Sequence, residues 1–204
     1  MDNRSLRYAG ILAIATEVTG VLTILLSIRY SPWFSWTENY LSDLGGEWGA
    51  SEIWTSRGNA GLIFNLGIFI AGSLGVSFTI LLLRASLTTD SREIMGIKVL
   101  QIAMVGMCGV GVFPETTGFL HTISAAMFFI LTPISIIMVS SAMRKEKKEF
   151  SDIMMGLGIL SFLLIPLLLL PPPYGRNALA ETLTILPSGI AILLWGNRLF
   201  RHET

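Results

Sequence analysis

A few polar side chains stand out in this apolar chain because their types suit acid–base chemistry. His121 is the one histidine within a long apolar run, and Ser42 and Asp43 are neighbours in a loop. An imidazole beside a carboxylate can move a proton, and a serine next to them can act as a nucleophile. If the chain is an enzyme, we expect His121, Asp43 and Ser42 to be catalytic, with Glu115 as a further partner for the imidazole. Its reaction would be hydrolysis or group transfer on a lipid or prenyl substrate.

The same region also fits a binding site that does no chemistry. Carboxylates attract cations, while amides and guanidinium groups hold lipid headgroups or other small polar ligands. The candidate ligand-binding residues are Glu38, Asn39, Asn59, Asn65, Glu115, Glu181, Arg57 and Arg176. Salt bridges that only tie loops together are the structural alternative for the charged members of this set.

A divalent cation is a third candidate for the carboxylates, with His121 as a nitrogen ligand. Against it, the second histidine, His202, lies near the far end of the chain, and no His-Glu-x-x-His motif is present. We therefore predict no cofactor, and the identity of any metal ligands stays open.

Composition indicates the environment in which these residues must lie. Only 14% of the 204 residues are charged, and 52% are hydrophobic. A typical soluble domain has about 25% charged residues. The net charge is zero, which leaves no basic surface for nucleic acid, and the single cysteine, Cys108, excludes an internal disulfide. The chain is therefore predicted to be an integral membrane protein surrounded by membrane lipids.

Six apolar stretches are long enough to cross a bilayer, which requires about 20 residues each. Their ends carry charges or helix breakers, such as Pro114 and Arg144. The sequence predicts an all-α, six-helix transmembrane bundle that forms a single domain over residues 1–204. The predicted spans are about 6–28, 58–83, 94–113, 119–143, 150–170 and 178–200.

Lysine and arginine are distributed unevenly between the two sides of this predicted bundle. Eleven belong to the side that holds both termini and the second and fourth connections. The other side has three, Arg29, Arg57 and Arg176. Because basic residues accumulate on the cytoplasmic side, we expect both termini to be cytoplasmic. The expected location is the plasma membrane of a prokaryote.

The first outer connection is predicted to contain a short helix in the membrane interface. Residues Ser35–Glu38 have the spacing of a capping box, and Gly45–Gly46 supply a stop signal. Aromatic and apolar residues between them share one helical face. We expect a helix from about Trp36 to Leu44, which is either a lipid-facing anchor or a lid over a cavity between the helices.

Polar residues of three spans recur at a similar depth in the outer half of the predicted bundle. Asn65 in the second span, His121 in the fourth and Glu181 in the sixth each share a helical face with small or polar residues. Lipid penalises such groups, so these faces should point into the bundle and form an outward-facing polar pocket. The fifth span is nearly all Leu, Ile and Phe over its outer half, and we expect it to face lipid.

Glu17 is a carboxylate near the middle of the first span, where an unpaired charge is costly. It can pair with Gln101, Lys98 or Asn65 as a structural contact. Alternatively, it handles protons or cations, in which case the chain would be a coupled transporter.

These motifs resemble a prokaryotic, largely archaeal six-helix family known as domain of unknown function 998. The resemblance is carried by Glu38-Asn39-Tyr40-Leu41-Ser42-Asp43-Leu44-Gly45, Asn59, Asn65, Phe113-Pro114 and His121. More distantly, the loop Ser42-Asp43-Leu44-Gly45 is similar to the family of the FGF-receptor-activating protein and the damage-regulated autophagy modulator. The first resemblance implies six spans and a shared site at Asn39, Ser42, Asp43, Asn65 and His121, without a mechanism. The second implies a membrane-organising or regulatory role. The oligomeric state stays open.

Overall fold

The computed structural model describes residues 3–47, 56–85, 90–145, 147–170, 175 and 177–201. Its described part is helical, with no strand. The long helices are α1 (Asn3–Arg29), α2 (Gly58–Ala85), α3 (Ser91–Val112), α4 (Phe119–Met143), α5 (Lys148–Leu164) and α6 (Ala178–Phe200). Three short 3-10 turns accompany them, η1 (Ser42–Leu44), η2 (Glu115–Thr117) and η3 (Ile165–Leu169).

Six helices in the described residues are long and apolar enough to cross a membrane, with η3 extending α5. This confirms the predicted all-α class and the multi-pass character, and the helix bounds agree with the predicted spans to within a few residues. Which side of the membrane each end of the bundle faces stays a prediction.

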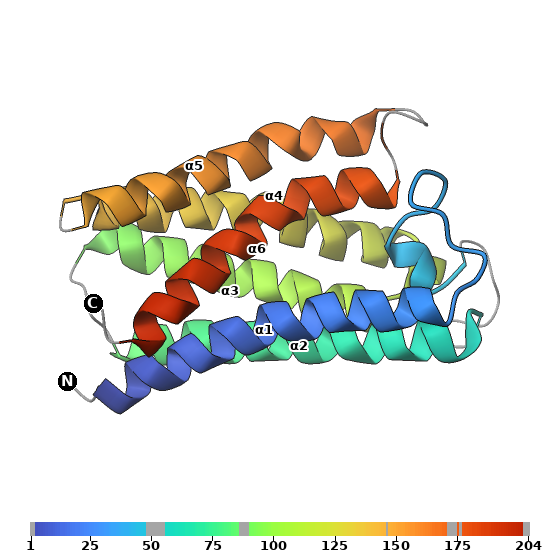
Figure 1. Ribbon diagram of the computed structural model, residues 1–204, viewed down its shortest axis with the longest axis horizontal. Helices are drawn as coiled ribbons and strands as arrows, with labels where there is room; N and C mark the ends of the chain where they lie inside the picture. Colours follow the sequence, from blue (N-terminus) through green and yellow to red (C-terminus); the bar gives the residue numbers. More distant parts are fainter. Residues whose placement is uncertain are drawn as a thin grey trace.

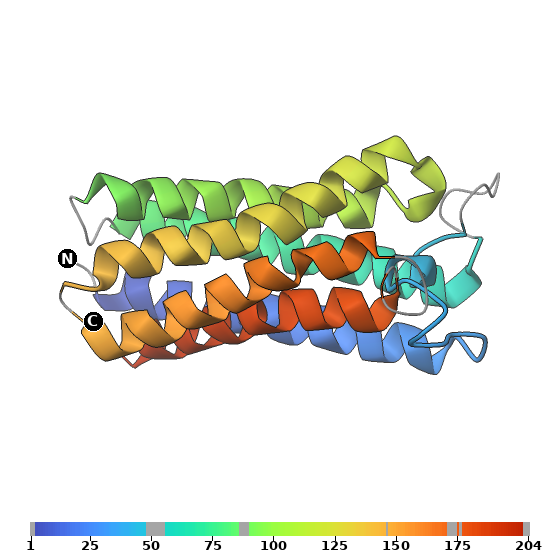
Figure 2. The same cartoon turned by 90° about the horizontal axis from the view of Figure 1, so that it is seen from above.

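The helices lie along one long axis and form a closed ring in chain order, in which α6 packs back against α1 (Figures 1 and 2). Both termini lie at the same end of this ring, which we call the terminal end. The opposite end carries η1 and η2, and we call it the loop end. Successive helices run in opposite directions, so η1 and η2 of the first and third connections lie together at the loop end with their candidate polar residues.

The small and polar faces of the helices point into the bundle, as predicted. Asn65 on α2, Thr132 on α4, and Thr184 and Ser188 on α6 are all fully buried. By contrast, α5 is the span with the smallest buried share, and its apolar side chains are largely exposed, as expected for a lipid-facing helix. Burial of hydroxyls and amides in a membrane is costly without hydrogen-bond partners, and the Ser188 hydroxyl has none among the described residues. Thr132 instead donates to the Phe128 carbonyl at 2.6 Å.

Local sequence signals set where several helices begin and end. Asp90 caps α3 by accepting the Arg92 backbone N–H at 2.8 Å, and Asn177 caps α6 by accepting that of Ala180 at 2.9 Å. The α-helical part of α5 stops before η3 because Pro166 has no N–H to donate to the preceding turn.

The contact between α1 and α6 is closest near the terminal end. A Cβ on Gly10 would lie 2.5 Å from the Gly196 carbonyl oxygen and 2.6 Å from the Phe200 nitrogen, so only glycine lets the two backbones approach this far. From this crossing α6 diverges from α1 toward the loop end (Figure 1).

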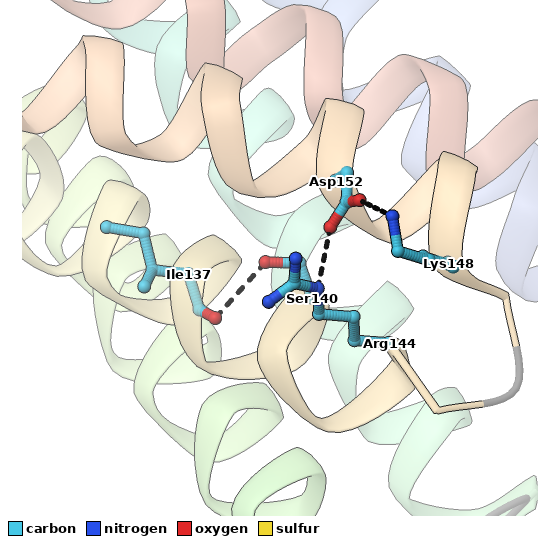
Figure 3. Close-up of polar contacts among 5 residues, drawn as sticks. All are labelled: Ile137, Ser140, Arg144, Lys148 and Asp152. Carbon is cyan, nitrogen blue, oxygen red and sulfur yellow. Dashed lines mark hydrogen bonds and ion pairs between the residues drawn. The ribbon is translucent and has the colours of Figure 1, made fainter.

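At the terminal end, Asp152 of α5 lies between two basic groups (Figure 3). It pairs with Arg144 at 2.8 Å and with Lys148 at 3.1 Å. Arg144 and Lys148 are exposed and Asp152 is partly exposed, so these pairs contribute little to stability and mainly link the end of α4 to the start of α5. Ser140 on α4 donates to the Ile137 carbonyl of its own helix at 3.1 Å.

Candidate binding cavity

A cavity of about 220 Å³ lies between the helices in the loop half of the bundle. Its wall is built by α1, α2, α3, α4 and α6, while α5 contributes no residue to it. Most of the wall is apolar, with Phe64, Ile68, Phe128 and Ile185 among its members. The polar residues of the wall are Thr16, Glu17, Ser42, His121, Thr132, Glu181 and Thr182.

The loop after α1 covers the loop end of this cavity, and Leu41 and Ser42 form part of the wall. The loop is fixed to the start of α6 by backbone hydrogen bonds. Ala178 donates its N–H to the Asn39 carbonyl at 2.6 Å, and Leu179 donates to the Trp36 carbonyl at 3.1 Å. These bonds satisfy first-turn donors of α6 that have no partner within the helix.

The predicted helix from Trp36 to Leu44 is wrong, because only the 3-10 turn η1 forms within it. Asp43 accepts the Tyr40 N–H at 2.9 Å, which a helix would direct to the Trp36 carbonyl, and Asn39 accepts the N–H of the preceding Ser35 at 2.9 Å. The carbonyls of Trp36 and Asn39 accept from α6. Such local captures compete with a helix, and here the tertiary contacts decide the outcome.

Three carboxylates from three segments meet beneath this loop. Glu181 of α6 accepts the Leu41 backbone N–H at 2.5 Å, and Glu115 of η2 accepts the Ser42 hydroxyl at 3.0 Å. Asp43 hydrogen-bonds to Glu115 and lies close enough to Glu181 to repel it electrostatically. The Asn39 amide donates to Asp43 at 3.1 Å. Of the candidate site residues, Asn39, Ser42, Asp43, Glu115 and Glu181 therefore lie together in the fold.

The pKa of Glu115 is raised from its ordinary value of 4.5 to about 8. Burial is the largest cause, and the hydrogen bond and charge of Asp43 add to it, followed by the charge of Glu181. The Ser42 hydroxyl opposes the shift by donating to the carboxylate. Glu115 is thus protonated at neutral pH, which lets it share a proton with Asp43 rather than repel it.

This proton makes the stability of the protein depend on pH. The folded state binds a proton at Glu115 between pH 4.5 and about 8 that the unfolded state has released. The contribution of this proton to the free energy of unfolding is complete below the ordinary pKa of Glu115. It is lost as the pH rises through the raised pKa, by up to about 1.4 kcal/mol per pH unit. We expect the melting temperature to fall across this window and Glu115→Gln to flatten that fall. Thermal melts from pH 5 to pH 9 check this, and an equally steep profile in Glu115→Gln would contradict it.

His121 lies at the same end of the cavity, on the first turn of α4. Its Nδ1 is 2.8 Å from the Phe113 carbonyl oxygen, an acceptor, so Nδ1 carries the proton of the neutral ring. Nε2 is then an acceptor with no hydrogen-bond partner among the described residues. Asp43 is close enough to interact electrostatically with the ring.

The hydrogen bonds do not join the candidate catalytic residues into a nucleophilic triad. Ser42 gives its proton to Glu115, and Ser124, the other serine near His121, gives its proton to the Leu120 carbonyl at 2.8 Å. A triad requires the base to accept the proton of the nucleophile. Catalysis by His121, Asp43 and Ser42 stays a prediction.

Several candidate ligand-binding residues lie away from the cavity. Asn65 is fully buried behind the wall, where its amide donates to the Gly45 carbonyl at 2.7 Å and holds the loop. Glu38 and Asn59 are exposed. Arg57 pairs with Glu47 at 3.4 Å and stacks 4.0 Å above the Trp33 ring. Arg176 lies outside the described residues.

Glu17 lies on the cavity wall, and no hydrogen bond or ion pair joins it to another described residue. The predicted structural pairing with Gln101, Lys98 or Asn65 is therefore wrong. Its Oε2 would be 2.8 Å from a Cβ on Gly189 of α6, so the missing side chain of Gly189 makes room for the carboxylate. Sequence reasoning missed Gly189 because a helical glycine beside a carboxylate gives no signal until the two helices are placed.

The described residues include no group of three or more His, Cys, Asp or Glu side chains arranged to hold a metal ion. The carboxylates beneath the loop are occupied by the Leu41 N–H, the Ser42 hydroxyl and one another. A divalent cation at the site stays a prediction that this arrangement does not favour.

Residues 12–197 match the family described as a protein of unknown function, DUF998. The chain belongs to the DUF998 family. The predicted resemblance is thereby confirmed over most of the chain. No curated protein and no solved structure gives a significant match. The archaeal bias and the more distant similarity to the FGF-receptor-activating protein stay predictions. Because DUF998 carries no assigned activity, the function of this member must be argued from its site.

Proposed function

We propose that this DUF998 protein binds an organic cation with an apolar body inside its membrane-embedded cavity. The single observation that supports this best is the charge of the wall. Among the described residues, the formally charged members of the wall are Glu17 and Glu181, and none is Lys or Arg. Asp43 and Glu115 add carboxyl groups directly behind the wall. An anionic ligand such as a phosphate-bearing headgroup would find no basic side chain among the described wall residues.

Several polar groups of the wall already donate their protons within the protein, which supports the same class of ligand. Thr16 and Thr132 give their protons to backbone carbonyls, and Ser42 gives its proton to Glu115. His121 gives its Nδ1 proton to Phe113. These groups then offer lone pairs to a ligand, so a molecule that brings its own donors, such as a protonated amine, complements them.

The shape of the bundle favours entry from the membrane. Val21 of α1 and Leu186 and Ile190 of α6 belong to the wall, yet they are 54%, 51% and 39% exposed. They lie on the two helices that diverge toward the loop end in Figure 1. An apolar ligand body can reach the cavity between these helices while η1 covers the end. If the positive-inside distribution holds, that end faces the outside of a prokaryotic plasma membrane.

Binding of two probes of the same chain length whose headgroups carry opposite charges tests the proposal. We expect the protein in lipid nanodiscs to bind dodecylamine and not dodecanoate, measured by calorimetry against empty nanodiscs. Gly20→Leu should abolish amine binding, because Gly20 belongs to the wall and its added Cβ meets only Met107, at an ordinary 3.6 Å, leaving the longer side chain to fill the cavity.

Gly156→Leu on α5 is the matched control, since a Cβ there meets nothing within 4 Å and α5 is outside the wall. It should bind dodecylamine like the wild type. Equal binding of dodecanoate, or unchanged amine binding in Gly20→Leu, would overturn the proposal.

A further inference from the structure

The cavity holds two carboxylates at different depths. Glu181 lies at the loop end, where it accepts the Leu41 N–H, and Glu17 lies beside Gly189, deeper in the bundle. Gly189 follows Glu181 by eight positions on the same helix. At a rise of about 1.5 Å per residue, the two levels are about 12 Å apart along α6.

The protein partners of these two carboxylates differ. Glu181 and the groups around it form a hydrogen-bonded cluster. Glu17 has no hydrogen-bond or ion-pair partner among the described residues, although it belongs to the wall and Gly189 leaves space for its carboxylate. A carboxyl group in the membrane interior is costly unless something pairs with it. The Glu17 carboxyl group is therefore placed to pair with a group that a ligand brings into the cavity.

The wall between the two levels is apolar. It includes Ile185 and Leu186 on α6, Ile24 on α1 and Phe128 on α4. A methylene chain fits such a wall, whereas a chain of hydroxyl or phosphate groups would lose its water without gaining partners.

From this arrangement we infer that the ligand is a linear aliphatic amine with two separated ammonium groups. One nitrogen pairs with Glu181 at the loop end, the second pairs with Glu17, and the methylene spacer lies along the apolar wall. This assignment rests on the proposed function, since it names the class of cation that the cavity takes. It also gives Glu17 a role in selectivity between amines rather than in binding every amine.

Four probes distinguish the inferred binding of a diamine from the proposed binding of organic cations in general. They are diaminodecane, decylamine, the short diaminobutane and decanoate, each titrated into the protein in nanodiscs. We expect the wild type to bind diaminodecane at least about tenfold more tightly than decylamine, as an added charge-assisted pair predicts. Diaminobutane cannot reach both carboxylates and should bind no better than decylamine. Glu17→Gln should lose the preference for diaminodecane and keep the wild-type affinity for decylamine.

Glu38→Gln makes the same chemical change at an exposed carboxylate and should leave every affinity unchanged. Gly189→Ala is the second test variant, because its Cβ displaces the Glu17 carboxylate, and it should reproduce the Glu17→Gln result if that variant does not fold. Decylamine binding without any preference for diaminodecane, or a preference that survives in both variants, would overturn the inference and leave the proposed function standing. Binding of neither amine, or equal binding of decanoate, would overturn the proposed function itself.

Discussion

Gly10→Leu is expected to lower the melting temperature of the protein more than any other single change proposed for it. A Cβ at this position would meet the Gly196 carbonyl oxygen at 2.5 Å and the Phe200 nitrogen at 2.6 Å. Both atoms are backbone, so they cannot rotate away as a side chain would. Forcing extra atoms into such a contact costs about 1–3 kcal/mol or more. The substitution must therefore separate α1 from α6 where they close the helical ring.

Thermal melts of the purified protein in one detergent measure this effect, with Gly156→Leu as the control. That variant adds the same side chain to another helix at a site with no neighbour within 4 Å, so its melting temperature should stay near the wild-type value. Equal stability of the two variants would contradict the close α1–α6 crossing, and with it the shape of the cavity.

Glu181→Gln is expected to weaken dodecylamine binding by about 10-fold to 100-fold. The amide oxygen of glutamine can still accept the Leu41 N–H, so the loop stays docked while the negative charge is lost. A hydrogen bond to a charged group contributes about 1.5–3 kcal/mol, which corresponds to the expected loss of affinity. Calorimetry in nanodiscs measures it, with Glu38→Gln as the exposed counterpart.

Glu181→Ala separates the two tasks of this residue. It removes the charge and also leaves the Leu41 N–H without its acceptor beneath the loop, so it should lower both amine affinity and melting temperature. If Glu181→Gln binds dodecylamine as tightly as the wild type, the carboxylate only holds the loop and does not recognise a cation.

Much of the fold could be predicted from the sequence because a bilayer permits few alternatives. Apolar runs of sufficient length must be helices there, and the burial of Asn65, Thr132 and Thr184 follows from the cost of exposing polar groups to lipid. The meeting of Asp43, Glu115 and Glu181 was also predictable, since alternating helices bring their connections to the same end.

What could not be predicted depends on contacts between distant segments. The loop from Trp36 to Leu44 carries local helix signals, but its carbonyls bond to the start of α6. The cavity depends on where α1 and α6 cross, which Gly10 and Gly196 set and no periodicity encodes. The surroundings of Glu17 follow from the same crossing, so the sequence marked the residue as unusual without showing that it faces an open space.

Locating a bound amine tests the central claim most directly. Crystals of the protein grown with a dodecylamine that carries bromine at its far end would report the position of the chain by anomalous scattering. We predict a bromine peak inside the cavity between α1 and α6, on the Glu17 side of Glu181, and no such peak in Gly20→Leu. A cavity without bromine, with peaks only on lipid-facing surfaces such as that of α5, would contradict the binding of an organic cation within this protein.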